Sequence, residues 1–503
     1  VVLWPATFLS ASPQQSVIGV AAMALLQLLR RPLEVLWKHW LVWLLFFLAN
    51  GMLPLVNTIE GAFARSLVAC SEVPSAPDPL FSGSAYCGDR LHVIAEGQQL
   101  SSFAASVESF AKISTAVAAA VCIDLYGRRN ILLAGLSCTA ASVLLFVLAC
   151  MLPGPWARAL FVLGQGLQGA LPAEMLLSQV VVDLTTRLPR TEAQSYFEVQ
   201  MIVQFLPVYF FGFAASFIQV LELRDYTALW CSVLLVNSGL VILAAVFFPE
   251  ARDKFKPEWH ATRGGIIGGV RRELEDYRQL FVETRELGRV EFIFAHLLFC
   301  AMSSRKFAVL VFSYSMSYYD LSAARVTLYV LPIIFIHVFC APLVGVVCRL
   351  LGMRRGFVFV CAFKAAACGL FLLQPYLCWA WFLQFYLSSL ASGWDALMKN
   401  MSAAIFKERL SKYLALADLC KDGANILAAP AYALTFNAKA TSRVARMLPG
   451  LLSFKLYLFA MAILFQHSTG VWSMFCLGLD TLQQEQDAGS EAKREASSRK
   501  RSD

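Results

Sequence analysis

Long apolar runs alternate with short polar gaps along most of the chain. The runs are close to the ~20 residues that a helix needs to cross the hydrocarbon core of a membrane. A helix also satisfies its own backbone hydrogen bonds, which lipid cannot do. The pattern therefore predicts an all-α polytopic membrane protein with twelve transmembrane helices, at approximately 36–57, 99–123, 131–152, 159–182, 201–221, 228–248, 291–314, 326–347, 357–374, 378–403, 411–436 and 449–468.

The composition supports a membrane protein and excludes a water-soluble core. Hydrophobic residues make up 58% of the 503 positions and charged residues 15%, against roughly 45–50% and about 25% in soluble domains. The formal net charge of +8 does not indicate a nucleic-acid partner. The basic residues lie mostly in the short gaps between apolar runs, as cytosolic loops require.

The spans divide into two sets of six, which suggests an internal duplication. Residues 36–248 are predicted to form the first six-helix bundle and 291–468 the second, joined by a cytosolic linker at 249–290. The segment 1–35 favours an interfacial helix over a cleaved signal peptide, and the tail 469–503 has a largely disordered composition. The bias of Lys and Arg toward one set of loops predicts that both termini lie in the cytosol. The membrane is expected to be the plasma membrane or an organelle membrane.

Most of the fourteen cysteines lie inside apolar runs, where they are interpreted as small packing residues. Cys70 and Cys87 differ, because they share the polar segment "CSEVPSAPDPLFSGSAYCGD". A disulfide between them is expected if this segment faces an oxidising compartment. No Cys/His cluster has metal spacing, so neither a metal nor another cofactor is predicted.

The gap "DLYGRR" joins the second and third spans in a tight connection. Gly127 can take backbone angles that are closed to other residues. Arg128 and Arg129 hold the gap in the cytosol and can reach lipid phosphates. Asp124 can pair with a basic residue or a helix N-terminus.

This gap resembles the loop motif of the major facilitator superfamily, which reads Gly, three residues, Asp, a basic residue, any residue, Gly and two basic residues. Ala120 stands here at the first glycine, and Leu125 replaces the first basic residue. The stretch "GVVCRLLGMRR" repeats the motif between spans eight and nine, with Arg349 in place of the acid. The positions that echo the motif are Gly345, Arg349, Gly352, Arg354 and Arg355.

The resemblance covers roughly residues 36–468 and implies the family's fold of two six-helix bundles around a central site. It also implies that Asp124, with Gly127, Arg128, Arg129 and the echo, acts as a latch between conformations. The subfamily is not specified. Leu160 occupies a position where the family has a basic residue. Span five lacks the glycine series of antiporters, and this absence favours symport or uniport.

Charged residues inside the first six spans are candidates for function, because such charges are costly in lipid. Glu108 and Lys112 lie four residues apart on one helical face and form either a self-neutralising pair or a gate and proton site. Glu174 has no local partner and could carry a proton. The stretch "GQGLQG" (164–169) lies within a span, which indicates close helix packing through small residues rather than nucleotide binding.

Further candidates lie in the remaining spans and at the end of the first. Arg305 is the first candidate for binding an anionic solute, together with Lys306, and the alternative is a salt bridge to another helix. Asp395 and Lys399 form either a structural pair or part of the site. Asn57 and Glu60 end span one and could line the outer mouth. Lys364 is interpreted as pairing or snorkelling. The charges of span eleven, which are interpreted as a solvated helix start, are Asp418, Lys421 and Asp422.

These features predict a secondary active transporter that moves a small polar or anionic organic solute by alternating access. Proton coupling is assigned to Glu174, Glu108 or Glu60. Membrane lipids are the other expected partners, and we expect a monomer. The residues show no clustered nucleophile or metal set, so an enzyme is not predicted. The rival prediction is a solute receptor that has the same fold but does not transport.

Overall fold

The described part of the chain is α-helical. The computed structural model describes residues 33–69, 90–152, 154–171, 226–248, 265–286, 313–321, 353–373, 378–390 and 410–465, with a few shorter stretches at 180–181, 195–196, 199–200, 202–203, 206–207, 210–211, 325–326, 329, 336 and 376. All statements below concern these residues. The cysteines of the expected disulfide, Cys70 and Cys87, lie outside them, as do residues 1–32 and 466–503.

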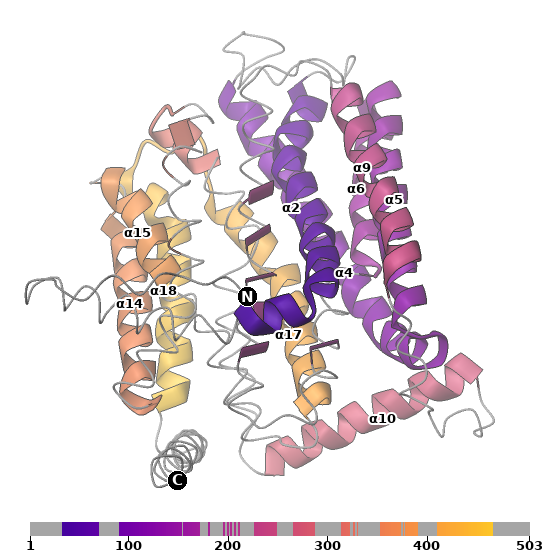
Figure 1. Ribbon diagram of the computed structural model, residues 1–503. Helices are drawn as coiled ribbons and strands as arrows, with labels where there is room; N and C mark the ends of the chain where they lie inside the picture. The colour runs from indigo at the N-terminus through magenta and orange to yellow at the C-terminus, as the bar shows by residue number, and fades with distance from the viewer. Residues whose placement is uncertain are drawn as a thin grey trace, which may run out of the picture.

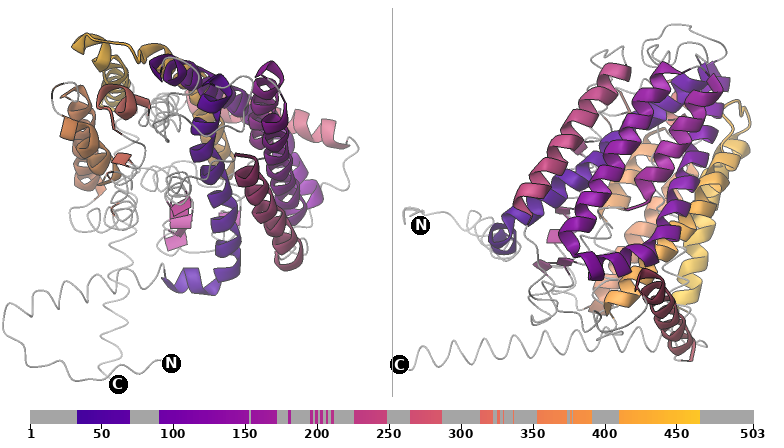
Figure 2. Two further views of the ribbon diagram at one scale, coloured as in Figure 1. Left: turned by 90° about the horizontal axis from the view of Figure 1, so that it is seen from above. Right: turned by 90° about the vertical axis from the view of Figure 1, so that its right-hand side faces the viewer.

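Two groups of helices stand side by side (Figure 1). The first group consists of α2 (Trp40–Ala69), α4 (Arg90–Tyr126), α5 (Arg128–Met151), α6 (Gly154–Gly169) and α9 (Tyr226–Phe247). The second consists of α14 (Met353–Leu373), α15 (Cys378–Leu390), α17 (Leu410–Thr435) and α18 (Arg443–Phe465). The two groups meet where α17 packs against α4, and the views from above and from the side agree on this arrangement (Figure 2).

The linker between the groups contains α10 (Gly265–Glu286), which crosses one end of the bundle and touches both α4 and α17 (Figure 1). This helix lies within the segment 249–290 that was predicted as the linker. The side of the molecule that carries α10 is called the α10 side below.

The apolar runs form helices close to their predicted limits. α5 and α9 match the spans predicted at 131–152 and 228–248. α5 ends at Met151 because Leu152 precedes Pro153 and has extended backbone angles (φ −109°, ψ 150°). Among the residues that the structure describes, three helices are long and apolar enough to cross a membrane: Arg128–Met151, Tyr226–Phe247 and Arg443–Ala462.

The first two helices extend further than hydropathy predicted. Residues 58–98 were expected to form a loop, but α2 continues to Ala69 and α4 begins at Arg90. Arg65, expected in that loop, is a helical residue with only 4% exposure. The expectation was wrong because polar side chains lower the hydropathy of a helix even when other helices cover them.

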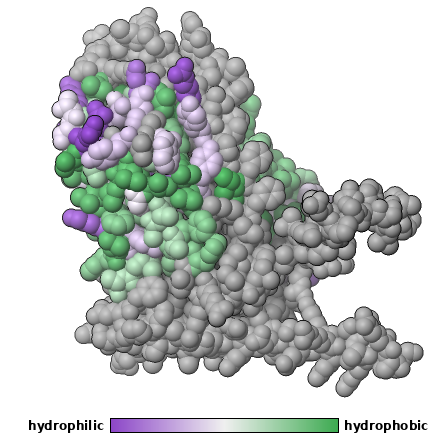
Figure 3. Space-filling view, turned by 90° about the vertical axis from the view of Figure 1, so that its left-hand side faces the viewer, coloured by the Kyte–Doolittle hydropathy of each residue, from purple (hydrophilic) through white to green (hydrophobic). Residues whose placement is uncertain are grey.

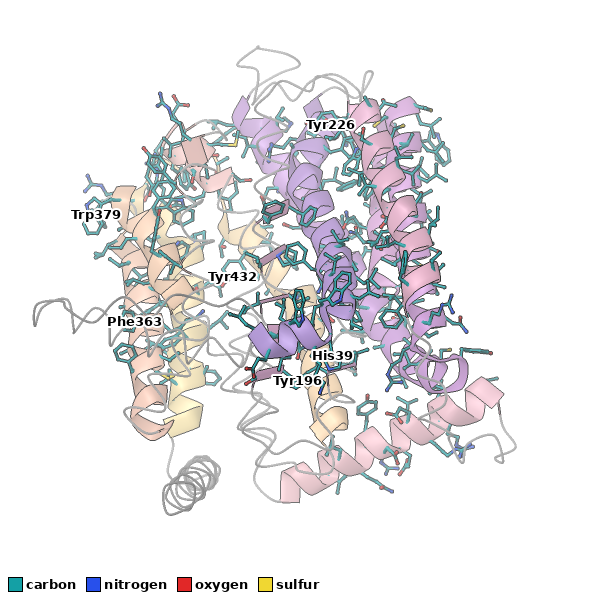
Figure 4. The ribbon with its side chains drawn as sticks, in the orientation of Figure 1. His39, Tyr196, Tyr226, Phe363, Trp379 and Tyr432 are labelled. Carbon is teal, nitrogen blue, oxygen red and sulfur yellow. The ribbon has the colours of Figure 1, made fainter. Side chains whose placement is uncertain are left out.

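Apolar side chains cover the outer surface of the second group. Figure 3 shows this face, with hydrophobic residues over its middle and lower part and polar residues gathered at its upper end. Trp379 on α15 is 57% exposed and points away from the bundle (Figure 4). Exposed apolar helices of this kind are suited to lipid, since water disfavours large apolar surfaces.

Candidate functional site

The buried face of α4 carries a polar stretch between Gln98 and Lys112. Glu108 and Lys112 are only 6% and 8% exposed. The spacings of three and four residues place the buried polar residues on one side of the helix. The other members of this polar face are Gln98, Ser101, Ser102 and Ser109. The sequence identified the two charges but not the serines and the glutamine. A neutral polar side chain costs much less in lipid than a charge, so it does not mark a functional position by itself.

The polar face of α4 is the place where the two helix groups are joined. The Lys112 Nζ lies 3.7 Å from the Asp422 Oδ1 on α17, and their side chains are 10% and 19% exposed. The Ser313 hydroxyl donates to the Gln98 Oε1 at 2.8 Å. Ser106, also on α4, donates to the Ile426 carbonyl at 3.5 Å. Ion pairs and hydrogen bonds therefore connect residues that are more than 200 positions apart in the sequence.

The location of Asp422 corrects its interpretation as part of a solvated helix start. Asp422 lies more than three helical turns after Leu410, the first residue of α17. Its side chain is mostly covered and faces Lys112 of the other group. The side chains of Asp418 and Lys421 lie outside the described residues.

The helix α2 carries two further buried charges. Glu60 is fully buried and Arg65 is 4% exposed. Gly97 of α4 permits close approach, because a Cβ at this position would lie 2.5 Å from the Arg65 Cγ. Arg65 thus lies in the packing of α2 on α4 within the first group.

The glycines of "GQGLQG" confirm the predicted close helix packing. A Cβ at Gly169 would lie 2.2 Å from the Glu108 carbonyl oxygen, and one at Gly166 would lie 3.1 Å from the Val107 Cγ1. The two glutamines of the same stretch, Gln165 and Gln168, are 0% and 4% exposed. Their side-chain amide atoms form no hydrogen bond within the described structure. α6 therefore brings polar groups as well as tight packing into the first group.

Aromatic clusters lie in both groups on the side opposite to α10. In the first group Phe63 packs against Phe161 and Trp230, with ring centroids 6.0 Å and 5.5 Å apart. In the second, Tyr314 stacks on Trp381 at 4.5 Å. Ile94 of α4 joins the core of the second group. The junction of the two groups therefore continues as an apolar contact at Ile94, one turn before Gln98 on α4.

Tyr318 and Arg446 add a polar contact at the end of this junction, outside the predicted spans. The Arg446 guanidinium lies 4.8 Å from the centroid of the Tyr318 ring. The Tyr318 hydroxyl donates to the Asn437 carbonyl. Burial raises the pKa of Tyr318 to about 12, although the charge of Arg446 opposes this shift. Tyr318 is therefore a neutral donor at physiological pH.

The loop "DLYGRR" has the backbone that its glycine predicted. Gly127 has a φ of 84°, which confirms the expected special conformation. The arginines, however, turn toward protein rather than toward lipid phosphates. Arg129 donates to the Ala245 carbonyl near the end of α9, and Arg128 is only 8% exposed. A cation at a helix C-terminus also interacts favourably with the helix dipole.

Several predicted site residues lie outside the described structure, or their side chains do. Glu174, Arg305, Lys306, Asp395 and Lys399 belong to undescribed stretches. Asn57 and Asp124 lie on α2 and α4, but their side chains are outside the description. The second copy of the motif is also largely outside the described structure. Gly345, Arg349 and Gly352 are not described, and only the backbone of Arg354 and Arg355 is described. Lys364 donates to the Ser388 hydroxyl at 3.2 Å, within the second group.

The sequence model of the Major Facilitator Superfamily matches residues 91–429. This chain belongs to the Major Facilitator Superfamily. The match spans the Gly127 loop, the linker and most of α17. No curated protein sequence matches the chain.

Solved transporters of this superfamily share the fold. The human organic anion transporter MFSD10 (TETRAN) is 14% identical, with a TM-score of 0.58 over 84% of this chain and 98% of that chain. The xylose transporter XylE from E. coli, in its inward open conformation, is 13% identical, with a TM-score of 0.54 over 84% and 95%. The nucleoside transporter NupG is 12% identical, with a TM-score of 0.55 over 83% and 98%.

Membership of the Major Facilitator Superfamily establishes the broad class. The chain is an integral, multi-pass membrane protein with the superfamily fold. Proteins of this superfamily are secondary transporters and generally not enzymes.

Proposed function

We propose that this protein moves a small polar or anionic organic solute across the membrane by alternating access, coupled to protons. The observation that carries the proposal is the polar face of α4, buried at the junction of the two groups. Buried charges are costly at membrane depth and are retained where they serve a pathway or a moving interface. A merely structural junction could be built from apolar side chains at lower cost.

The predicted cations and acids have separate roles in this proposal. Arg305 and Lys306 attract the solute, with Asp395, Lys399 and Asn57 as further contacts. Glu174, Glu108 and Glu60 are the predicted proton carriers. Glu108 and Glu60 are buried on neighbouring helices, as such a role requires. The Gly127 loop and its echo are the predicted latch of the α10 side.

The similar folds are compatible with this range of solutes. One of them is an organic anion transporter and another is a D-xylose–proton symporter. Both proteins are less than 25% identical to this chain. They show which kinds of solute the fold can transport and do not identify the solute of this protein.

Purified protein would be screened by thermal shift against sugars, amino acids, carboxylates and drugs, and the solutes that bind would be tested for uptake into proteoliposomes. Transport predicts saturable uptake that depends on an imposed pH gradient. Binding without flux would instead support the receptor. Uptake that ignores the pH gradient would retain the transporter and remove the proton coupling.

A further inference from the structure

The outward face of α18 is apolar except for one lysine. Lys455 is exposed and lies midway along the helix, with Leu451 one turn before it and Leu458 one turn after it. The exposed apolar residues that share this face at helical spacing are Val444, Leu448, Leu451, Leu458 and Phe459. These residues and the lysine are called the Lys455 face below. It carries a single positive charge in the middle of an apolar stripe.

The opposite side of α18 packs against α14. The Tyr457 hydroxyl donates to the Cys361 carbonyl at 2.7 Å, and a Cβ at Gly450 would lie 2.6 Å from the Phe371 Cδ1. Lys455 lies two residues before Tyr457, which is a rotation of about 200° around the helix axis. The right-hand view of Figure 2 shows α18, in yellow, at the edge of the bundle. The Lys455 face is therefore turned away from the protein and toward lipid.

Lys455 lies deep in the membrane-spanning part of this helix. α18 is long and apolar enough to cross a membrane from Arg443 to Ala462. Lys455 follows Arg443 by twelve residues and precedes Phe465, the last residue of α18, by ten. At about 1.5 Å per residue these separations are roughly 18 Å and 15 Å, within a hydrocarbon core of about 30 Å. The four-carbon stem of lysine, at about 6 Å, is too short to bring the ammonium group to either surface.

No group within the described structure neutralises Lys455. It forms no ion pair, hydrogen bond or cation–π contact with the described residues. The helices α14, α15 and α18 contain neither Asp nor Glu. α17 does contain acids, but Asp422 faces Lys112 of the first group, and the side chain of Asp418 lies outside the described residues.

Other charged side chains described within the apolar helices have protein around them. Lys364 of α14 donates to the Ser388 hydroxyl. Those of α2 and α4 are at most 8% exposed and are Glu60, Arg65, Glu108 and Lys112. Charges at membrane depth usually face protein or water in this way. A lysine on a lipid-facing stripe therefore calls for a partner that comes from outside the chain.

Three kinds of partner could supply the opposite charge or oppose it. A phospholipid headgroup would have to sink through about half of the hydrocarbon core to reach Lys455. A second copy of this chain, related by two-fold symmetry, would bring Lys455 against Lys455, and like charges repel. A transmembrane helix with one Asp or Glu near mid-span supplies a negative charge at the right depth, and its apolar residues can pack on Leu451 and Leu458.

We propose that the Lys455 face is the docking surface for another membrane protein, whose transmembrane helix carries a single acidic residue near mid-span. The carboxylate of that residue pairs with the Lys455 ammonium group, and apolar side chains of the partner cover Leu451 and Leu458. Both charges are then removed from lipid, and the ion pair fixes the depth of the partner along α18. The inference goes beyond the proposed transport, because it concerns the outer face of α18 and not the junction of the two groups.

A synthetic transmembrane peptide serves as the probe. The full-length protein would be reconstituted in phosphatidylcholine vesicles with a leucine–alanine helix that has one aspartate at its centre. Two further peptides, with leucine or lysine in place of the aspartate, are the controls for charge. Energy transfer at pH 8 between a dye on the protein and a dye on the peptide gives the dissociation constant for each peptide.

Disulfide cross-linking to a cysteine one turn from the centre of the peptide identifies the docking surface. Leu458→Cys places a cysteine on the Lys455 face. Leu235→Cys is the matched control, because Leu235 is a 75% exposed leucine on the apolar helix α9 of the first group. Both variants are made in a background that lacks the native cysteines.

We expect the aspartate peptide to bind at least about tenfold more tightly than the leucine peptide, and to cross-link to Leu458→Cys but not to Leu235→Cys. Lys455→Met should remove this preference, because the apolar face remains but its charge is lost. Lys455→Arg should retain the preference. Lys364→Met, which removes a lysine bonded within the second group, should leave binding unchanged.

Equal binding of the aspartate and leucine peptides would overturn the inference, and so would a preference that survives Lys455→Met or cross-linking that favours Leu235→Cys. Retention of added phosphatidylglycerol by the parent protein but not by Lys455→Met, measured by mass spectrometry without peptide, would assign the surface to a lipid headgroup and refute the protein partner. A dimer of the parent protein that depends on Lys455 would assign it to a second copy and equally refute it. None of these measurements uses solute uptake, so docking and transport are tested separately.

Discussion

Replacing Gly169 by alanine tests the close packing of α6 against α4 at the level of Glu108. A Cβ there would lie 2.2 Å from the Glu108 carbonyl oxygen and 2.9 Å from its carbonyl carbon. Both are backbone atoms, so no side chain can rotate away. α6 would have to move by about an ångström to restore ordinary van der Waals contact.

The expected loss of stability is about 1–3 kcal/mol, the usual effect of overpacking a filled interior. It exceeds the gain of roughly 1 kcal/mol that alanine brings over glycine in a helix interior. Gly239→Ala on α9 is the matched control, because nothing lies within 4 Å of its Cβ position. That variant should be neutral or slightly stabilised.

Thermal unfolding of the purified protein in detergent, followed by tryptophan fluorescence, would compare the two variants at one protein and detergent concentration. Gly169→Ala should unfold at a lower temperature than the parent protein, and Gly239→Ala should not. Equal unfolding temperatures for the two variants would show that α6 does not approach α4 as closely as described.

Four other variants test the sites individually. Arg305→Ala should be inserted normally and lose solute uptake if Arg305 binds the solute, whereas uptake with unchanged affinity would remove it from the site. Glu174→Gln should abolish the pH dependence of uptake if Glu174 carries the proton, and an unaltered pH profile would exclude this role. Gly127→Ala should cost about 1–3 kcal/mol in thermal stability, because its backbone angles are essentially restricted to glycine; an unchanged melting temperature would contradict this. Tyr318→Phe should lose about 1 kcal/mol with its hydrogen bond to Asn437, measured by the same melt, and equal stability would show that this bond contributes nothing.

The apolar helices could be predicted well from the sequence. α5 and α9 consist of nearly continuous apolar residues, so hydropathy located both ends within a few positions. The conformation of Gly127 was also predictable, because a loop this tight between two helices favours glycine.

The ends of α2 and α4 could not be found in the same way. Glu60 and Arg65 reduce the local hydropathy of α2, although both are buried by neighbouring helices. Hydropathy records the chemistry of a segment and not what covers it. The predicted limits therefore fell short wherever a helix has a polar, protein-facing side.

The partner of Lys112 was beyond the reach of local sequence patterns. Its nearest acid in sequence is Glu108, and the four-residue spacing favours pairing within α4. The ion pair shown by the structure joins Lys112 to Asp422, more than 300 positions away. Such a contact follows only from the packing of α17 on α4, which no local pattern encodes.

The position of α10 limits how the two groups can move. The helix packs against α4 and α17 at the same end of the molecule, and it belongs to the stretch of chain that runs from the first group to the second. A hinge motion that widens this end must lift α10 from at least one of its two supports. The helix α10 therefore ties the two groups together at this end of the molecule.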